Sequence, residues 1–268
     1  MLSKTDDPRP DTELAHWLQR QWAQYVAACE REHLPEDQYG LGQNPQLLST
    51  LHRVWGASQF VSDYCIRHPH WLWQAIQRNE LEAYPNPPYF QRLQTQIAAT
   101  PHLDEAQLGT IIRRFRYAEM VRIAWRDLAG WASLDETLSD LSHLADSCIQ
   151  TACQTLYGWH CAIWGTPCNA EGTPQPLVVL GMGKLGAYEL NFSSDIDLIF
   201  AYPEAGETVG IRSRSNEEFF RGLCQRLIQC LDAFTAEGFA YRVDTRLRPY
   251  GESGPLAMSF GAMETYYQ

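Results

Sequence analysis

The sequence has no long apolar run and no excess of basic residues. No stretch approaches the roughly 20 apolar residues that a membrane-spanning helix needs, and the polar first residues contain no apolar signal-peptide core. We therefore expect a cytoplasmic protein without a membrane partner. The 21 Lys and Arg against 32 Asp and Glu give a net charge of −11, which disfavours nucleic acid as a partner because binding to phosphates needs basic residues.

Paired cysteine motifs are also missing. The eight cysteines form no CxxC pair, and a chain of 268 residues without an export signal does not need a disulfide framework. We predict reduced thiols packed in a core. His160 beside Cys161 leaves zinc binding as the alternative.

The first part of the sequence is predicted to be helical. Apolar residues from Leu14 to Val26 recur mostly every three or four positions, which indicates one buried helix face. Further helices are predicted over 60–76, with a break near Pro69, over 103–132 and over 135–159. Loops are expected over 34–45 and around 85–88. We expect most of the arginines interleaved in the 103–132 helix to lie on a solvated face: Arg113, Arg114, Arg116, Arg122 and Arg126.

The pattern changes after Trp164. A loop rich in Gly and Pro over 165–176 precedes a short buried strand at 177–180 and a second strand at 195–202. Ser215 and Glu218 form a capping box that opens a helix, which Gly238 is expected to end. Residues 239–248 alternate as a strand that Pro249 stops. We predict an α+β protein, with a mainly helical region over 1–165 and a domain with a mixed sheet and flanking helices over 166–268.

A glycine loop follows the first predicted strand, with the pattern GxGxxG over 181–186. A dinucleotide-binding fold needs a full helix after these glycines and an acidic residue roughly 20 positions further on. Asp195 follows Gly186 by nine residues, which leaves no room for that helix. A Walker A loop is also excluded, because Leu185 and not Ser or Thr follows Lys184. A plain tight turn is the simple alternative.

Three aspartates on two predicted strands suggest metal chemistry. Strand alternation places Asp195 and Asp197 on one face, and a divalent cation such as Mg²⁺ would relieve their repulsion. Asp244 lies on the later strand, on the same face as Arg242, Arg246 and Arg248. A solvated acidic edge and a surface ladder of salt bridges are the alternatives. A Gly-rich loop, Asp-x-Asp and a later lone Asp together are the layout of nucleotidyltransferase folds of the polymerase-beta-like kind.

The same residues resemble a particular family, the bifunctional glutamine synthetase adenylyltransferase / adenylyl-removing enzymes. The matching stretches are GMGKLG at 181–186, ELNFSSDIDLIF at 189–200, YRVDTRLRP at 241–249 and GESGP at 251–255, with MVRIAWRDL at 120–128 and WGTPC at 164–168 upstream. The match is dense from about Arg113 to Gln268. Members carry two nucleotidyltransferase-like modules, and the sequence at 191–197 and 251–254 resembles the N-terminal, adenylyl-removing module. Since only one module is present, we expect a fragment or a truncated product.

The resemblance implies an activity and roles for residues. The enzyme would use phosphate to release AMP from a modified tyrosine of glutamine synthetase, giving ADP. Asp195, Asp197 and Asp244 would be catalytic and would hold one or two Mg²⁺ ions. Backbone N–H groups around Gly183 and Lys184, with Ser193 and Ser194, would bind the transferred phosphate. Arg246 and Arg248 would bind the attacking phosphate, unless one of them braces a carboxylate.

Other interpretations remain open. The module could catalyse the reverse reaction, in which AMP is transferred from ATP to glutamine synthetase and diphosphate is released. It could also be a catalytically silent regulatory module that docks on glutamine synthetase. A dehydrogenase requires binding of NAD(H), which the loop spacing disfavours. By resemblance, the nitrogen-signalling PII protein is a further expected partner.

Overall fold

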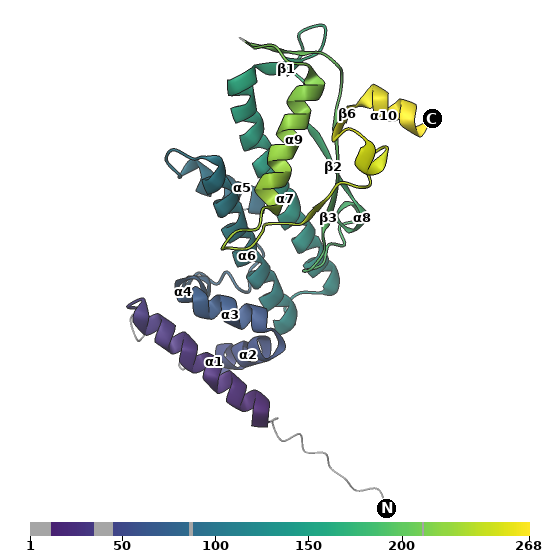
Figure 1. Ribbon diagram of the computed structural model, residues 1–268. Coiled ribbons are helices and arrows are strands. Elements are labelled where there is room, and N and C mark those ends of the chain that lie inside the picture. Colours follow the sequence, from purple (N-terminus) through teal and green to yellow (C-terminus); the bar gives the residue numbers. More distant parts are fainter. Residues whose placement is uncertain (1–11, 35–44, 86–87, 211) are drawn as a thin grey trace, which may run out of the picture. The chain divides into compact units, whose positions relative to one another are not determined.

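The computed structural model describes residues 12–34, 45–85, 88–210 and 212–268 (Figure 1). Helices occupy the described chain as far as Trp164, and strands begin at Thr166. The helices before the first strand are α1 (Thr12–Arg31), α2 (Pro45–Ala57), α3 (Gln59–Arg67), α4 (Pro69–Gln77), α5 (Tyr89–Ala98), α6 (Glu105–Ala129) and α7 (Leu134–Trp164).

The second part combines short strands with helices, which confirms the predicted α+β class. Its elements are β1 (Thr166–Cys168), β2 (Val178–Met182), α8 (Gly183–Gly186), β3 (Ile196–Tyr202), β4 (Glu207–Val209), α9 (Asn216–Asp232), β5 (Val243–Asp244), a 3₁₀ turn (Gly251–Ser253), β6 (Ala257–Ser259) and α10 (Phe260–Tyr267). None of the described helices is long and apolar enough to cross a membrane.

The chain forms two compact units. One unit holds residues 1–85 with Val121–Thr137, and the other holds residues 86–120 with Leu138–Gln268. Helices α6 and α7 therefore contribute residues to both units, so the units do not divide where the secondary structure changes. The division into domains at residue 165 stays a prediction.

The four-stranded sheet of the second unit is mixed. Strand β2 runs antiparallel to β3, while β5 and β6 both run parallel to β3. The antiparallel pairing across the glycine loop excludes a parallel βαβ unit at this position, as the loop spacing predicted. Strands β1 and β4 form a separate antiparallel pair, and β1 lies inside the segment that we predicted to be a loop.

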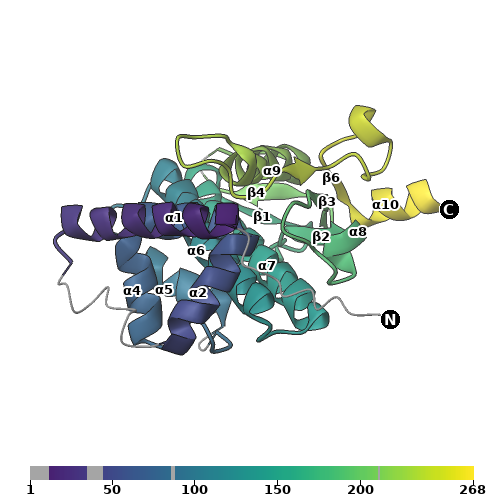
Figure 2. The same ribbon diagram turned by 90° about the horizontal axis from the view of Figure 1, so that it is seen from below.

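Helix α9 packs against the central strand. Ser215 caps the helix and accepts a hydrogen bond from the Glu218 amide, as the capping pattern predicted. The ring of Phe220 stacks on Tyr202 of β3, with centroids 4.7 Å apart. Figures 1 and 2 show α9 beside α7, and Phe219 contacts Tyr157 of α7 edge-on. The candidate site therefore rests on a strand whose position is fixed by buried aromatic packing.

Several predicted boundaries are confirmed. Helix α1 covers the Leu14–Val26 pattern, the break near Pro69 separates α3 from α4, and α6 and α7 occupy the two predicted long helices. Residues 35–44 of the loop predicted over 34–45, and residues 86–87 of the loop predicted around 85–88, lie outside the described residues.

Three predictions about the second part are wrong. Strand β2 is half-buried to exposed, because it pairs with β3 alone and forms an edge of the sheet. Helix α9 ends at Asp232, and Gly238 instead takes a φ of +78° in the turn that pairs it with Thr235. Only Val243–Asp244 of the predicted 239–248 strand pairs with the sheet, because residues after it turn back to bond one another.

The prediction of a solvated arginine face on α6 is also wrong. Arg113, Arg116, Arg122 and Arg126 are all buried. In the first unit, Arg122 donates to the carbonyl of Ala83 and Arg126 to that of Glu82, at 3.3 and 3.1 Å. These guanidinium groups satisfy backbone carbonyls of the segment that follows α4, a use that periodicity along one helix does not reveal.

Candidate active site

The register of the sheet brings two of the predicted aspartates side by side. Strand β5 pairs in parallel with the start of β3, so that Ile196 lies opposite Val243 and Asp197 opposite Asp244. The amide of Ile196 donates to the carbonyl of Arg242 at 2.9 Å, a hydrogen bond of this parallel pair. Carboxylates 47 positions apart in sequence thus share one end of the sheet.

Asp195 comes directly before β3 and is held by an arginine. Its Oδ1 lies 2.5 Å from Nε of Arg242, and Nη2 of the same arginine donates to the carbonyl of Ser193 at 3.0 Å. Arg242 therefore ties the segment before β3 to the segment before β5. Its position next to the aspartates is visible in the alternating sequence, but no role was assigned to it there.

Asp244 is paired with Arg246. The guanidinium donates from Nε and Nη2 to Oδ2 at 2.9 and 2.5 Å, and the backbone amide of Arg246 donates to Oδ1 at 2.8 Å. These hydrogen bonds from Arg246 lower the pKa of Asp244, which therefore stays ionised. Of the two arginines proposed to bind phosphate, Arg246 is the one that braces a carboxylate.

The surroundings of Asp197 disfavour its charged form. Burial is the largest cause that raises its pKa, and the negative charges of Asp244 and Asp195 raise it further. Such mutual repulsion is the condition that a bound cation would relieve.

The glycine loop approaches Asp197 closely. Gly183 has a φ of +54°, and a Cβ added to it would lie 2.7 Å from Oδ2 of Asp197. A Cβ on Gly186 would lie 2.5 Å from the carbonyl oxygen of Gly181. The glycines therefore allow one turn of helix, α8, to fold directly against β3 beside the carboxylates. Lys184 of this turn is exposed.

The two serines before Asp195 belong to a turn organised by Asn191. Ser194 Oγ donates to Asn191 Oδ1 at 2.7 Å, and the amide of Ser193 donates to the same oxygen at 3.2 Å. Asn191 was not among the predicted site residues, although its position two and three residues before the serines is typical of such a turn. The serine hydroxyls lie near the start of β3 through this turn.

Arg248 holds a loop together. It donates to the carbonyl and hydroxyl of Thr245 at 2.9 and 2.8 Å, and to the carbonyls of Glu252 and Gly254 at 3.1 and 3.3 Å. Its guanidinium thereby closes the turn over 245–254. Phosphate binding by Arg248 would compete with these four hydrogen bonds.

A cavity of about 520 Å³ joins these groups. Its lining contains four carboxylates and three arginines: Asp195, Asp232, Asp244, Glu252, Arg242, Arg246 and Arg248, with Val243 and Thr245. Asp197, Gly183, Lys184 and the two serines do not line it. The structure thus places the predicted residues around β3 in two groups, one facing the cavity and one beside α8.

The donor chemistry of the site suits Mg²⁺, which prefers carboxylate oxygens. Asp195 and Asp244 lie close enough to Asp197 for their charges to raise its pKa. Within the described residues no group of three potential ligands is arranged around one point. In this arrangement Arg242 contacts Asp195 and Arg246 contacts Asp244.

Zinc binding at His160 finds no support in the described residues. The His160 ring lies 2.8 Å from Nη1 of Arg226, and burial together with Arg226 and Arg214 lowers its pKa to about 4. All eight cysteines are unpaired, five of them are buried, and Cys153, Cys161 and Cys230 are half-buried.

The mixed sheet, the glycine turn and the paired aspartates define a nucleotidyltransferase-like α+β protein. The family model for glutamate–ammonia ligase adenylyltransferase matches residues 48–268. The chain therefore belongs to that family, a family of enzymes.

Curated relatives agree with this assignment. A "bifunctional glutamine synthetase adenylyltransferase/adenylyl-removing enzyme" of Nitrosococcus oceani is 55% identical over 82% of this chain, and its counterpart in Pseudomonas aeruginosa is 53% identical over 82%. The one from Shewanella loihica is 49% identical over 84%. The chain spans about 23% of the length of each of these relatives.

Proposed function

We propose that this chain carries the adenylyl-removing site of its family, which cleaves AMP from adenylylated glutamine synthetase by Mg²⁺-dependent phosphorolysis. The observation that supports it most is the register that sets Asp197 beside Asp244, next to a cavity lined by three arginines. The sequence of residues 191–197 and 251–254 resembles the adenylyl-removing module, which favours removal of AMP over its transfer. The relatives' names contain both activities.

The reaction exchanges one phosphorus–oxygen bond for another. An oxygen of inorganic phosphate attacks the phosphorus of the adenylyl group, and the bond to the tyrosine oxygen breaks. The products are ADP and the free tyrosine, whose phenolate takes up a proton. Since both the nucleophile and the reacting group are anionic, the site must supply positive charge at both.

The residues of the site suit these tasks. Asp195, Asp197 and Asp244 would hold Mg²⁺, which when bound neutralises charge on the transferred phosphate. Arg246 is placed to exchange its contact with Asp244 for the attacking phosphate, since guanidinium groups bind oxyanions with two hydrogen bonds. Backbone N–H groups of Gly183 and Lys184 and the hydroxyls of Ser193 and Ser194 would bind the adenylyl phosphate. Arg248 is the second proposed phosphate ligand.

The test is an assay with glutamine synthetase that carries labelled AMP. The chain is incubated with phosphate and Mg²⁺, and labelled ADP is measured; omission of either should abolish its release. Asp197→Asn should lower the rate on the order of a hundredfold or more with unchanged circular dichroism. Glu171→Gln, the same change at an exposed acid, should have no effect.

Other outcomes would assign the site differently. Incorporation of AMP from ATP with release of diphosphate would show the reverse reaction instead. Binding of glutamine synthetase without either reaction would identify a docking module. Binding of the PII protein, the other partner that we propose, is measured separately with the same chain.

A further inference from the structure

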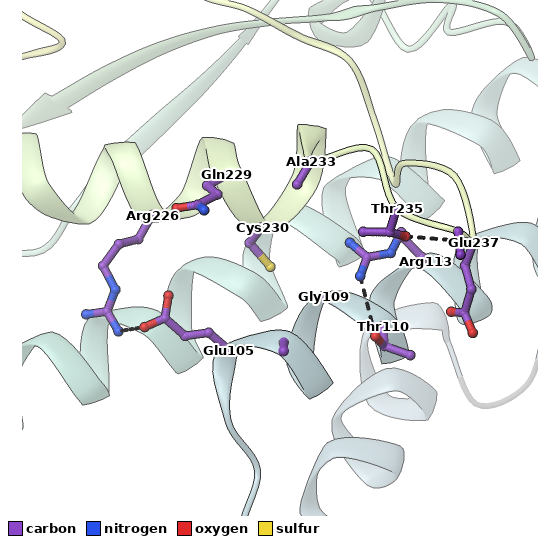
Figure 3. A pocket seen from close by; sticks show the side chains of 12 residues that line it. Glu105, Gly109, Thr110, Arg113, Arg226, Gln229, Cys230, Ala233, Thr235 and Glu237 are labelled. Carbon is purple, nitrogen blue, oxygen red and sulfur yellow. Dashed lines mark hydrogen bonds and ion pairs between the residues drawn. The ribbon is translucent and has the colours of Figure 1, made fainter.

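A second cavity lies in the same compact unit, between the start of α6 and the end of α9. It has a volume of about 560 Å³. Figure 3 shows its lining side chains, which come from α6, from α9 and from the turn after α9. The lining comprises Glu105, Ala106, Gly109, Thr110, Arg113, Arg226, Gln229, Cys230, Ala233, Thr235, Ala236 and Glu237.

Arg113 is the unusual member of this lining. The residue is only 5% exposed, yet it has no carboxylate partner among the described residues. Its Nε has no hydrogen-bond acceptor, and its Nη2 has one, the hydroxyl of Thr110, at 3.4 Å. Figure 3 shows the guanidinium between Thr110 and Thr235, within the cavity.

The other charges of the lining have ion-pair partners. Arg226 forms an ion pair with Glu105, and Oε1 of Glu237 accepts from Nε of Arg114 at 2.9 Å, while its Oε2 has no hydrogen-bond partner. With Arg114 counted, three arginines and two glutamates give the cavity one excess positive charge, that of Arg113. A buried charge without a partner is costly, and proteins keep such groups where a ligand or partner completes them.

The packing of α6 presents this guanidinium to the cavity. A Cβ added to Gly109 would lie 3.1 Å from Nη1 of Arg113, so the guanidinium lies against a helix surface that has no side chain there. A glycine in the interior of a helix is unfavourable relative to alanine. Gly109 therefore lowers the stability of the helix, but it leaves room for the guanidinium of Arg113 in the cavity.

We propose that this cavity binds a small organic monocarboxylate, with the carboxylate on Arg113. Guanidinium and carboxylate match in two parallel hydrogen bonds, and the single uncompensated charge favours a monoanion. Ala106, Ala233 and Cys230 offer apolar surface to the body of the ligand, while Thr235 and Gln229 offer polar groups. A second carboxylate on the ligand would approach Glu105 or Glu237 and bind less well.

The proposed site is separate from the candidate active site. None of the residues that line the 520 Å³ cavity lines this one. The last turn of α9 lies between them, since Asp232 faces the candidate active site while Gln229, Cys230 and Ala233 face the second cavity. Asp232 also accepts a hydrogen bond from the amide of Val243 in β5, at 3.2 Å. Binding to Arg113 can therefore be measured without any catalytic assay.

The experiment compares a charged probe with its neutral analogue. Sodium butyrate and butyramide have nearly the same shape and differ in the group that faces Arg113. In isothermal titration and thermal unfolding of the chain, we expect saturable binding and stabilisation by butyrate, and at least tenfold weaker binding of butyramide. Arg113→Gln should lose at least tenfold of butyrate affinity, while Arg221→Gln, an exposed arginine on α9, should lose none.

A structural role would give a different result. If Arg113 only supports the fold, Arg113→Gln lowers the melting temperature and butyrate binds both variants equally, which would overturn the proposal. If Arg113→Gln does not fold, crystals of the unaltered chain with 4-bromobenzoate, whose aryl bromine does not react with thiols, decide. Anomalous bromine signal in the cavity beside Arg113 supports the proposal, and bromine found only elsewhere, or nowhere, contradicts it.

Discussion

At the scale of single residues, the candidate site depends on where the backbone can come close to a carboxylate. Asp197 has a raised pKa because burial and two neighbouring aspartates disfavour its charge. A Cβ on Gly183 would lie 2.7 Å from Oδ2 of Asp197, and the φ of +54° at Gly183 suits a residue without Cβ. The environment of Asp197 therefore depends on the glycine at position 183 as well as on the neighbouring aspartates.

Replacement of Gly183 by alanine tests this close approach. The new Cβ would lie 2.7 Å from Oδ2 of Asp197, in a backbone conformation that alanine disfavours. We expect a loss of roughly 1–2 kcal/mol in the free energy of unfolding, and a fall in phosphorolysis on the order of tenfold to a hundredfold, because small displacements of reacting groups are costly.

Gly172→Ala is the matched control for this change. Gly172 has a φ of +83°, and nothing lies within 4 Å of an added Cβ. This variant should show a comparable loss of stability with an unchanged rate of phosphorolysis. Equal rates in both variants would mean that the contact between Gly183 and Asp197 does not matter for the reaction.

At the scale of elements, short-range patterns predicted α1, α3, α4, α6, α7, α9 and the central strand, but not α2, α5, α8 or α10. Helix α9 begins directly after its cap, Ser215, because the capping pattern is encoded within four residues, and β3 was predicted as the strand over 195–202. The edge position of β2, the β1–β4 pair and the short β5 depend on partners far away in the sequence. The burial of Arg113, Arg116, Arg122 and Arg126 depends on such partners too.

The predicted site shows the same division. Sequence spacing selected Asp195, Asp197 and Asp244, and the parallel register places the last two side by side. Arg246 and Arg248 were both predicted to bind phosphate, whereas the structure gives them different contacts. Arg246 contacts a carboxylate, and Arg248 binds carbonyls of its own loop. These differences arise from the turn after β5, which a strand pattern does not contain.

Arg116 connects α6 to the segment that leads into β5. Its guanidinium lies 4.7 Å from the ring centroid of Tyr241 and 5.8 Å from that of Phe239. We expect Arg116→Ala to lower the free energy of unfolding by roughly 2–3 kcal/mol, since it removes buried packing and cation–π contacts. Chemical denaturation followed by tryptophan fluorescence measures this loss.

Two further variants identify the cause. Arg116→Lys should restore little of the lost stability, because an ammonium cannot stack flat on the rings as a guanidinium does. Arg114→Ala, on the same helix with a side chain 70% exposed, should cost less than about 1 kcal/mol. Full rescue by lysine would mean that charge alone, and not stacking, stabilises this contact.

At the scale of the whole molecule, acidic residues outnumber basic ones. The sequence has only two lysines, Lys4 and Lys184, so that arginines make up 19 of its 21 basic residues. Four arginines of α6 are buried, and Arg242 and Arg246, although exposed, are paired with aspartates of the candidate site. The other exposed arginines belong to a chain whose net charge is −11.

This excess of acidic residues predicts that phosphate recognition is confined to small ligands. Binding of a nucleic acid backbone needs several exposed cations along one surface, because affinity comes from the number of phosphates neutralised. In a mobility-shift assay at about 150 mM salt, the chain should give no complex with double-stranded DNA or transfer RNA at protein concentrations up to roughly 10 µM. A complex formed below about 1 µM would contradict this prediction. It would mean that the exposed arginines form a continuous basic surface despite the net charge of −11.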